Sequence, residues 1–384
     1  LLIGASEVIP HGAGEVTRLT FDPESTETTL FDLAGFNETI NGLTTSGEGT
    51  ATFDNSADAT ASTFTFGAND DTVITSNNSV KTVFTDSGTG TLSLQKTGTA
   101  AAVFDTDVTL THQGNTGVDG GGSLTIQTAL QSTNGLTVDG ASSLLDIDGV
   151  ISAPASIATV TVDNGGTLDL SNTNGDKISM VSALTLASAG NATLILDLGD
   201  TAGNDQLLTD KITATGAATT GTATETITID VVDLGITANG VNVYDLIAAT
   251  GGLTSTGVVY ALGNVPGYLS GLLTLNTSDT LVQIGTVAAP GASTVYWTGS
   301  QATTSWNTSN AGPLTNFSTD VAGAANYTLV PQISDTVIFV ADSIAAAGVP
   351  ITTTLDSDFR INDIQFREST ITTDTPSAVT IDAG

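Results

Sequence analysis

The sequence contains no cysteine, so disulfide bonds and thiolate metal sites are both excluded. Basic residues are few: seven Lys and Arg stand against 40 Asp and Glu, which gives a formal net charge of −33. Nucleic acids and anionic membrane surfaces require a basic face, so this balance argues against both as partners. No apolar run approaches the roughly 18 residues of a membrane-spanning helix, and membrane insertion is therefore not expected.

Charged and aromatic residues are also scarce, at 12% and 5% of the chain, and helical periodicity is almost absent. The composition does not indicate disorder, because hydrophobic residues make up 39% and recur in short Leu, Val and Ile triplets. So many small apolar portions predict a thin core distributed along a repetitive fold. An elongated body would also tolerate the charge, since screening acts over about 8 Å at physiological ionic strength.

The dominant pattern is alternation with a period of two, which predicts short, half-buried strands. Turn sequences such as GNTG, DGGG and DNGG separate the strands, because Gly and Asn supply the positive φ values that tight turns require. The clearest predicted strands contain residues 92–94, 108–110, 124–126, 136–138, 160–162, 168–170, 184–186 and 194–196.

Strands at this spacing fit two architectures. Tandem β-sandwich domains would pair successive strands antiparallel, in domains of about 100 residues that usually contain a buried aromatic anchor. A parallel β-helix, or β-solenoid, would stack coils of roughly 20 to 25 residues and align like residues into ladders. Between residues 88 and 200 Phe104 is the one aromatic residue, whereas Leu, Val and Ile recur at inward positions. An all-β parallel solenoid is therefore favoured, with residues 159–176 forming most of one coil.

The asparagines and aspartates of the turns have two interpretations. Their side chains can bond nearby backbone groups or stack into ladders at the coil corners. Alternatively, their hard oxygen atoms can bind calcium, for which the candidates are Asp70 and Asp71 in GANDD and Asp200 and Asp205 in LGDTAGND. Neither segment matches the tandem GGxGxD calcium repeat, so the first interpretation is preferred. No other cofactor is expected.

The character of the sequence changes near residue 200. GNDQLLTDKITATG (203–216), a Tyr-Asp-Leu-Ile strand, a Gly-Tyr strand and a closing Leu-Val strand resemble the end of a module in the autotransporter-associated β-strand repeat family. YWTGSQATTSWNT (296–308) and the strands after it resemble the opening of the next module, and LLIGASEVIPHGAG with LAGFNETINGLT resembles a mid-module segment. The likeness covers roughly residues 1–55 and 200–384, and the family's glycine-rich GTLTLSG hallmark survives only as GTLSLQKTG (90–98). It implies a right-handed coil and a large bacterial surface or secreted protein.

The only two tryptophans, Trp297 and Trp306, lie at the opening of that second module. The segment TVAAPGAST (286–294) would then be the seam between a solenoid body, residues 1–290, and a following β module, residues 291–384. Trp297, Trp306 and Phe317 are interpreted as packing anchors that seat the module on the solenoid. Stacking on a glycan is the alternative if the rings are exposed.

Both chain ends have strand-like sequences without a polar cap. They place Leu1, Leu2 and Ile3 at one end, and Val379 and Ile381 at the other. An uncovered last coil presents unpaired amides and an open apolar core. Each end is therefore predicted to meet another copy, or another stretch of one longer polypeptide, and the module with Trp297 and Trp306 is predicted to take part in this contact.

Many parallel β-helices cleave polysaccharides with a carboxylate pair about 5 to 9.5 Å apart, or with calcium and a basic residue. Solvation of an outer face explains the acidic doublets of this chain as well as catalysis does, and His11 and His112 stand in turn-like sequences. The doublets are Asp70 with Asp71, Asp105 with Asp107, and Asp146 with Asp148.

The sequence thus predicts a structural, non-enzymatic protein of the cell surface or extracellular space, whose uncapped solenoid ends join head to tail into a fibre or surface layer. Other copies of the chain are the expected partners. An adhesin that displays loops to a cell or a glycan is the alternative. A polysaccharide-degrading β-helix enzyme is a more remote one.

Overall fold

A computed structural model gives the fold, and its described residues form strands and connecting turns without an α-helix. The chain divides into two compact units. Unit 1 comprises Leu1–Ile236, Tyr244–Asn264 and Leu275–Ile284, and unit 2 comprises Thr237–Val243, Val265–Thr274 and Gly285–Gly384. The described residues are 1–11, 18–67, 81–130, 135–149, 156–172, 177–199, 208–216, 218–220, 225–234, 243–254, 258–266, 269, 272–286, 293–298, 304–306, 315–320, 325, 327, 330–331, 334–340, 351–355, 359, 361–367 and 379–383.

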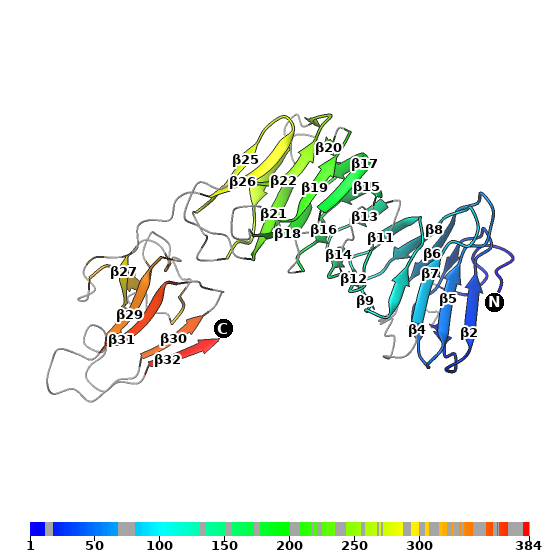
Figure 1. The fold of residues 1–384 in the computed structure, drawn as a ribbon, viewed down its shortest axis with the longest axis horizontal. Coiled ribbons are helices and arrows are strands. Elements are labelled where there is room, and N and C mark those ends of the chain that lie inside the picture. Colours follow the sequence, from blue (N-terminus) through cyan, green and yellow to red (C-terminus); the bar gives the residue numbers. More distant parts are fainter. Residues whose placement is uncertain are drawn as a thin grey trace. The chain divides into compact units, whose positions relative to one another are not determined.

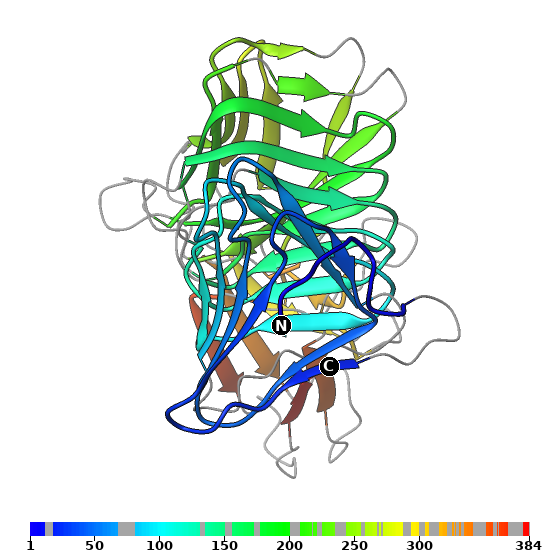
Figure 2. The same ribbon diagram turned by 90° about the vertical axis from the view of Figure 1, so that its right-hand side faces the viewer.

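Unit 1 is a stack of coils whose strands line up into long sheets (Figures 1 and 2). The largest sheet has the order β25 (Leu273–Thr277), β26 (Leu281–Thr286), β22 (Val243–Ala249), β19 (Lys211–Ala214), β17 (Lys177–Leu186), β15 (Ser156–Asp163), β13 (Gly135–Asp139), β11 (Asn115–Val118), β8 (Leu92–Lys96), β6 (Ser62–Phe66) and β3 (Glu38–Thr39), with β20 (Ala218–Thr220) beside β17 and β23 (Leu253–Thr254) beside β20.

Two further sheets and one strand pair complete the sides of the coils in unit 1. The second sheet has the order β24 (Val259–Leu262), β21 (Thr226–Asp233), β18 (Ala192–Leu198), β16 (Gly166–Asp169), β14 (Leu144–Ile147), β12 (Ser123–Ile126) and β9 (Ala101–Phe104). Nearer the N-terminus lie the sheet β10 (Val108–Leu110), β7 (Lys81–Thr85), β5 (Thr50–Asp54) and β2 (Thr28–Asp32), and the pair β1 (Arg18–Phe21) and β4 (Gly42–Thr45).

Strands of successive coils pair in parallel, which confirms the β-solenoid and excludes tandem β-sandwiches, whose strands would pair antiparallel. Leucines at equivalent positions form a buried ladder: Leu124 lies opposite Leu145, Leu145 opposite Leu168, and Leu168 opposite Leu194. The coil predicted over residues 159–176 contains the end of β15, the turn Asn164–Gly165 and β16, and its last four residues lie outside the described residues. Both turn residues have positive φ, 53° and 88°, which Asn and Gly tolerate better than other residues.

The coils are less uniform than the sequence suggests. The register advances by 20 residues from Asn115 to Gly135 but by 35 residues from Ala192 to Ile227. The strands β18 and β21 on either side of the longer coil still pair in continuous parallel register, so the added length does not displace their side chains from the ladder. The predicted coil length of 20 to 25 residues therefore holds for the middle of unit 1 and is wrong for its later coils.

Aromatic residues fill the N-terminal third of unit 1. Phe31, Phe53 and Phe84 occupy equivalent positions on β2, β5 and β7, and the rings of Phe53 and Phe84 stack with centroids 4.8 Å apart. Phe84 stacks in turn on Phe104, with centroids 5.1 Å apart. Offset stacking of this kind adds about 0.5–1.5 kcal/mol per pair to the burial of the rings. The core changes from phenylalanine to aliphatic residues after Phe104.

Unit 2 repeats the parallel arrangement on a smaller scale. One sheet has the order β28 (Phe317–Ser318), β27 (Thr294–Trp297), β29 (Thr336–Val340) and β31 (Asp363–Arg367), and the other pairs β30 (Ile351–Leu355) with β32 (Val379–Ala383). The pairs β27–β29, β29–β31 and β30–β32 are parallel. The chain thus alternates between the two sheets, with β29 and β30 in one coil and β31 and β32 in the next.

Candidate assembly surfaces

Aspartates at strand ends tie each coil of unit 1 to the next. Asp32 accepts hydrogen bonds from the amide of Ser56 (3.1 Å) and from its hydroxyl (2.6 Å), one coil later. Asp54, the register partner of Asp32, repeats this arrangement with the amide (2.8 Å) and hydroxyl (2.5 Å) of Ser87. These contacts confirm, for the described turns, that Asx side chains satisfy polar groups at the coil corners. Sequence analysis did not pair these aspartates with their serines, which lie 24 and 33 residues further along the chain.

The described residues of the first coil of unit 1 are 1–11 and 18–21, and they lie against the coil formed by β2, β3 and β4. Leu1 and Asp32 exchange backbone contacts, with the Asp32 amide donating to Leu1 O (2.9 Å) and the Ile3 amide donating to Asp32 O (2.8 Å). On the side of the coil formed by β3, the buried carboxylate of Glu38 accepts hydrogen bonds from the amides of Val8 (3.0 Å) and Ile9 (2.7 Å). The first coil is therefore held by the same parallel pairing that joins the interior coils.

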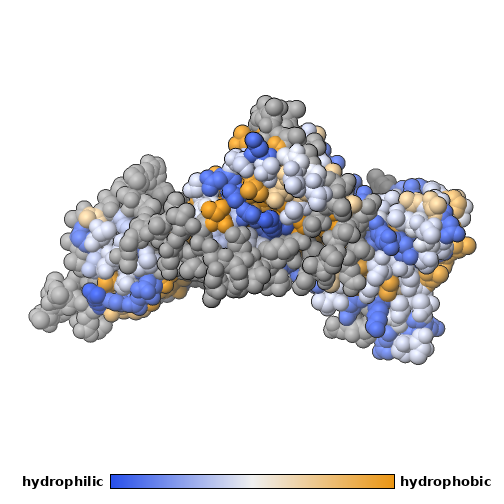
Figure 3. Space-filling view, turned by 45° about the horizontal axis from the view of Figure 1, so that its top comes forward, coloured by the Kyte–Doolittle hydropathy of each residue, from blue (hydrophilic) through white to orange (hydrophobic). Residues whose placement is uncertain are grey.

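The side chains of this first coil are not fully covered. Ile3 is buried, whereas Leu1 and Leu2 are 65% and 67% exposed, and Val8 is also exposed. Hydrophobic atoms, drawn in orange, gather at the N-terminal end of unit 1, on the right of Figure 3. Exposed apolar residues beside a strand edge are a recognised surface for further β pairing.

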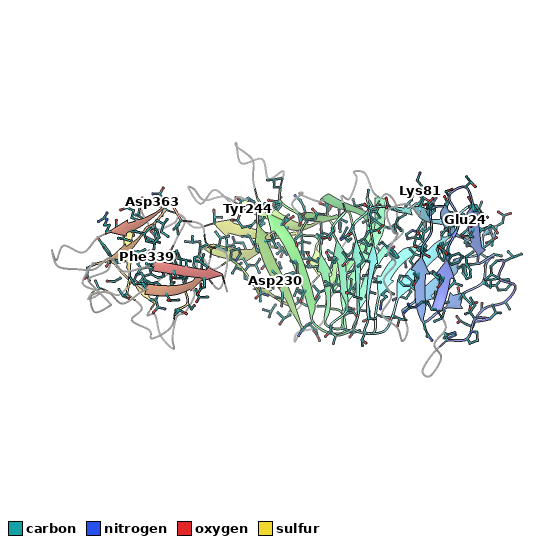
Figure 4. The ribbon with its side chains drawn as sticks, turned by 90° about the horizontal axis from the view of Figure 1, so that it is seen from below. Glu24, Lys81, Asp230, Tyr244, Phe339 and Asp363 are labelled. Atoms are coloured by element: carbon teal, nitrogen blue, oxygen red, sulfur yellow. The ribbon has the colours of Figure 1, made fainter. Side chains whose placement is uncertain are left out.

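The last coil of unit 2, formed by β31 and β32, shows the same contrast with the coil before it. Val337 and Phe339 on β29 are 0% and 1% exposed, and Phe339 lies inside the unit (Figure 4). Their register partners on β31, Ile364 and Phe366, are 37% and 58% exposed. Among the described strands β31 is the outermost of its sheet, and the ladder that is buried between coils therefore ends there on an exposed apolar edge.

On the other side of this last coil, Val379 and Ile381 of β32 are partly buried against the core of unit 2. They lie opposite Ile351 and Thr353 of β30 in parallel register. The structure thus places Leu1 and Leu2, and the strand with Val379 and Ile381, on outermost coils. Whether these coils bind another copy stays a prediction.

The opposite end of each stack is bounded by an antiparallel strand. In unit 2, β28 runs antiparallel to β27 and brings Phe317 opposite Trp297. In unit 1, β25 and β26 are hydrogen-bonded neighbours joined by three residues, a connection that only antiparallel strands can make. Such strands interrupt the parallel stack. Both interruptions fall at internal positions of the sequence, whereas the open edges belong to the first coil and the last coil.

Trp297 and Trp306 are buried in the core of unit 2, each with 2% of its surface exposed. Phe317 packs edge-on against both rings, with centroid distances of 5.2 Å to Trp297 and 5.5 Å to Trp306. Glycan stacking requires exposed rings, so this alternative is wrong for both tryptophans. Their burial also leaves the open edge of unit 2 to other residues, chiefly Ile364 and Phe366.

The calcium candidates Asp70, Asp71, Asp200 and Asp205 lie outside the described residues. Within the part of the chain that is described, no group of three or more His, Asp or Glu side chains is arranged to hold a metal ion. Of the other acidic pairs, Asp105 accepts a hydrogen bond from the Asp107 amide (3.0 Å), as in a turn.

Asp146 lies near two other carboxylates, those of its doublet partner Asp148 and of Asp169. Asp146 on β14 and Asp169 on β16 are register partners, so two carboxylates face outward on adjacent strands. Burial, aided by the charges of Asp148 and Asp169, raises the pKa of Asp146 to about 6, and burial also raises the pKa of Asp169. Thr125 Oγ1 donates to Asp146 Oδ2 (3.0 Å). Carboxylates facing one another at strand spacing cost stability at neutral pH.

The two histidines occupy different environments. His11 Nδ1 lies 3.1 Å from the carbonyl of Ile9 and 3.4 Å from the carboxylate of Glu7, both in the first coil. His112 is fully buried, with Nε2 2.9 Å from Thr116 Oγ1. Neither imidazole is placed against a serine or threonine hydroxyl and a carboxylate together in the contacts of the described residues.

No protein-family model and no curated protein sequence matches this chain. The resemblance to the autotransporter-associated β-strand repeat family therefore stays a prediction. A search of the described residues finds no helix with the length and apolar character needed to span a bilayer.

Proposed function

We propose that this chain is a structural protein that assembles head to tail through its outermost coils, as part of an extracellular fibre or surface layer. The observation that carries the proposal is the end of the buried ladder in unit 2, where Val337 and Phe339 give way to the exposed Ile364 and Phe366. A further coil stacked in parallel on β31 and β32 would bury these side chains, as β31 and β32 cover the coil before them.

The first coil of a second copy offers both parallel backbone pairing and exposed apolar side chains for this contact. Its segments already pair in parallel with β2 and β4, and its outer side carries the exposed Leu1, Leu2 and Val8. Burial of apolar surface contributes about 25 cal/mol per Å², and each new backbone hydrogen bond adds a net 0.5–1.5 kcal/mol. The antiparallel strands β25 and β28 interrupt the parallel stack at the other end of each unit. They therefore support growth through the first coil and the last coil.

A location outside the cell is part of this proposal. It is supported by the absence of cysteine, by the acidic composition and by the family resemblance of residues 1–55 and 200–384. A rod of parallel coils also resists proteolysis, because cleavage requires backbone that is not already paired.

Negative-stain microscopy and analytical ultracentrifugation of the purified chain in 0.15 M NaCl test the proposal. We expect filaments whose length grows with protein concentration. Phe366→Asp, which places a charge on the open ladder of β31, should abolish them. Val232→Asp, at an exposed apolar position on β21 between β18 and β24, should not. Wild-type protein that remains a monomer at all concentrations would refute the assembly.

A further inference from the structure

The charges on the two outermost coils have the same sign. The first coil and the turn after it carry four exposed carboxylates, Glu7, Asp22, Glu24 and Glu27. Glu24 lies at the N-terminal end of unit 1 in Figure 4. In the whole sequence six of the eight glutamates fall within the first 48 residues. The end of unit 1 that is open to further pairing is thus acidic.

The last coil of unit 2 does not offer a complementary basic face. Asp363 and Asp382 are exposed on β31 and β32, and Asp363 lies on the outside of the unit (Figure 4). Arg367 is the one arginine or lysine among the described residues of this coil. Its guanidinium donates to Gln365 Oε1 through Nε (3.1 Å) and Nη2 (2.7 Å), and Gln365 Nε2 donates to Asp363 Oδ2 (2.7 Å). Arg18 on β1 of the first coil is also exposed, so among the described residues two cationic side chains stand against the six exposed carboxylates of both surfaces.

Apolar and charged groups act against each other at such a contact. The exposed Leu2, Ile364 and Phe366 favour contact at any ionic strength. The carboxylates oppose it, with each unscreened pair at about 4 Å costing about 1 kcal/mol in water. The Debye length falls from about 30 Å at 0.01 M salt to about 8 Å at 0.15 M, so added salt removes most of the repulsion and leaves the apolar attraction.

We infer that end-to-end assembly of this protein is switched on by ionic strength, because its two joining surfaces, the acidic first coil and the Asp363–Asp382 coil, repel each other at low salt. This inference rests on the proposed head-to-tail function and adds its regulation. A contact built on complementary charges would weaken as the ionic strength rises, since salt would screen its attraction.

Filament growth measured by light scattering between 0.01 and 0.5 M NaCl tests the inference. We expect growth to be roughly tenfold faster at the high end. The double variant Glu24→Gln with Glu27→Gln should grow at 0.01 M NaCl nearly as the wild type does in high salt. Arg367→Gln, which removes the cationic side chain described on the last coil, should require more salt than the wild type.

A matched control separates local repulsion from net charge. Asp148→Asn with Asp279→Asn removes the same two charges from exposed positions away from both outermost coils, and it should leave the salt dependence of growth unchanged. Filaments that grow more slowly as salt rises would overturn the inference and leave the proposed function standing. The same conclusion follows if the control variant matches the glutamate variant. Absence of filaments at every ionic strength would overturn both.

Discussion

The buried His112 makes the free energy of unfolding depend on pH. Burial lowers the pKa of His112 to about 4, from about 6.5 in an unfolded chain. Between these values the unfolded chain binds a proton that the folded chain does not. The stability due to the neutral imidazole is therefore complete above about pH 6.5 and is lost as the pH falls from about 6.5 to 4. The loss amounts to about 3 kcal/mol.

We expect His112→Gln to remove most of this pH dependence, because glutamine can still bond Thr116 but does not titrate. Urea unfolding of both proteins at pH 7 and pH 4.5 measures the effect, and the wild type should lose about 2–3 kcal/mol more than the variant. The raised pKa of Asp146 acts in the opposite sense over the same window, so the two proteins must be compared at each pH. An identical pH dependence in both would contradict this role of His112.

At the scale of elements, the coil corners depend on carboxylates that receive several hydrogen bonds. Asp163, at the end of β15, accepts the amides of Asn164 (2.8 Å), Ala189 (2.8 Å) and Gly190 (3.1 Å), and the hydroxyl of Ser188. Burial acts to raise the pKa of Asp163, but these hydrogen bonds outweigh it and the pKa lies below its usual value of 3.8. Three of the four donors come from the next coil, so one side chain joins β15 to the coil that follows.

Asp163→Ala should destabilise unit 1 by about 2 kcal/mol at pH 7, since the donors at a charged acceptor lose their partner. The exposed Asp148→Ala is the control and should change stability by less than about 0.5 kcal/mol. Because the folded pKa of Asp163 is lowered, its contribution is present above about pH 4 and disappears as the pH falls through the folded pKa. Denaturant midpoints at pH 7 and pH 2.5 test both statements, and equal losses in the two variants would refute the tie between coils.

At the scale of the whole molecule, the division into two units separates two spectroscopic signals. Both tryptophans belong to the core of unit 2, whereas most strands, and hence most of the far-ultraviolet circular dichroism, belong to unit 1. In unit 1, Phe53 lies within 5.8 Å, centroid to centroid, of Phe21, Phe31, Phe64 and Phe84. The two cores can therefore be perturbed and observed independently.

Phe53→Ala should cost about 3–5 kcal/mol, the usual loss for a buried phenylalanine. We expect it to shift the circular dichroism transition and to leave the tryptophan fluorescence transition in place. Phe339→Ala, in the core of unit 2, should do the reverse. Coincident shifts of both signals in either variant would mean that the units unfold as one, contrary to this expectation.

The solenoid was predictable because its signal is local and repeated. Each Leu-Thr-Leu type segment defines an inward face by period two, and Asn164–Gly165 defines a turn without reference to any other coil. The Asp54–Ser87 and Asp163–Ser188 ties were not predictable, because their partners are 33 and 25 residues apart and the coil lengths between them vary. The phenylalanine ladder was missed for the same reason, since Phe31, Phe53 and Phe84 become equivalent only after the register is known.

By itself the amino-acid sequence determined the strand pattern, the turns, the acidic charge and the strand-like character of both ends, since each of these depends on residues close together in the chain. Only the tertiary structure decided which ladder ends exposed, at Ile364 and Phe366, and that Trp297 and Trp306 are buried. The physical reason is that burial depends on what lies across the stack, and in a solenoid the neighbour of a side chain is one whole coil away in sequence.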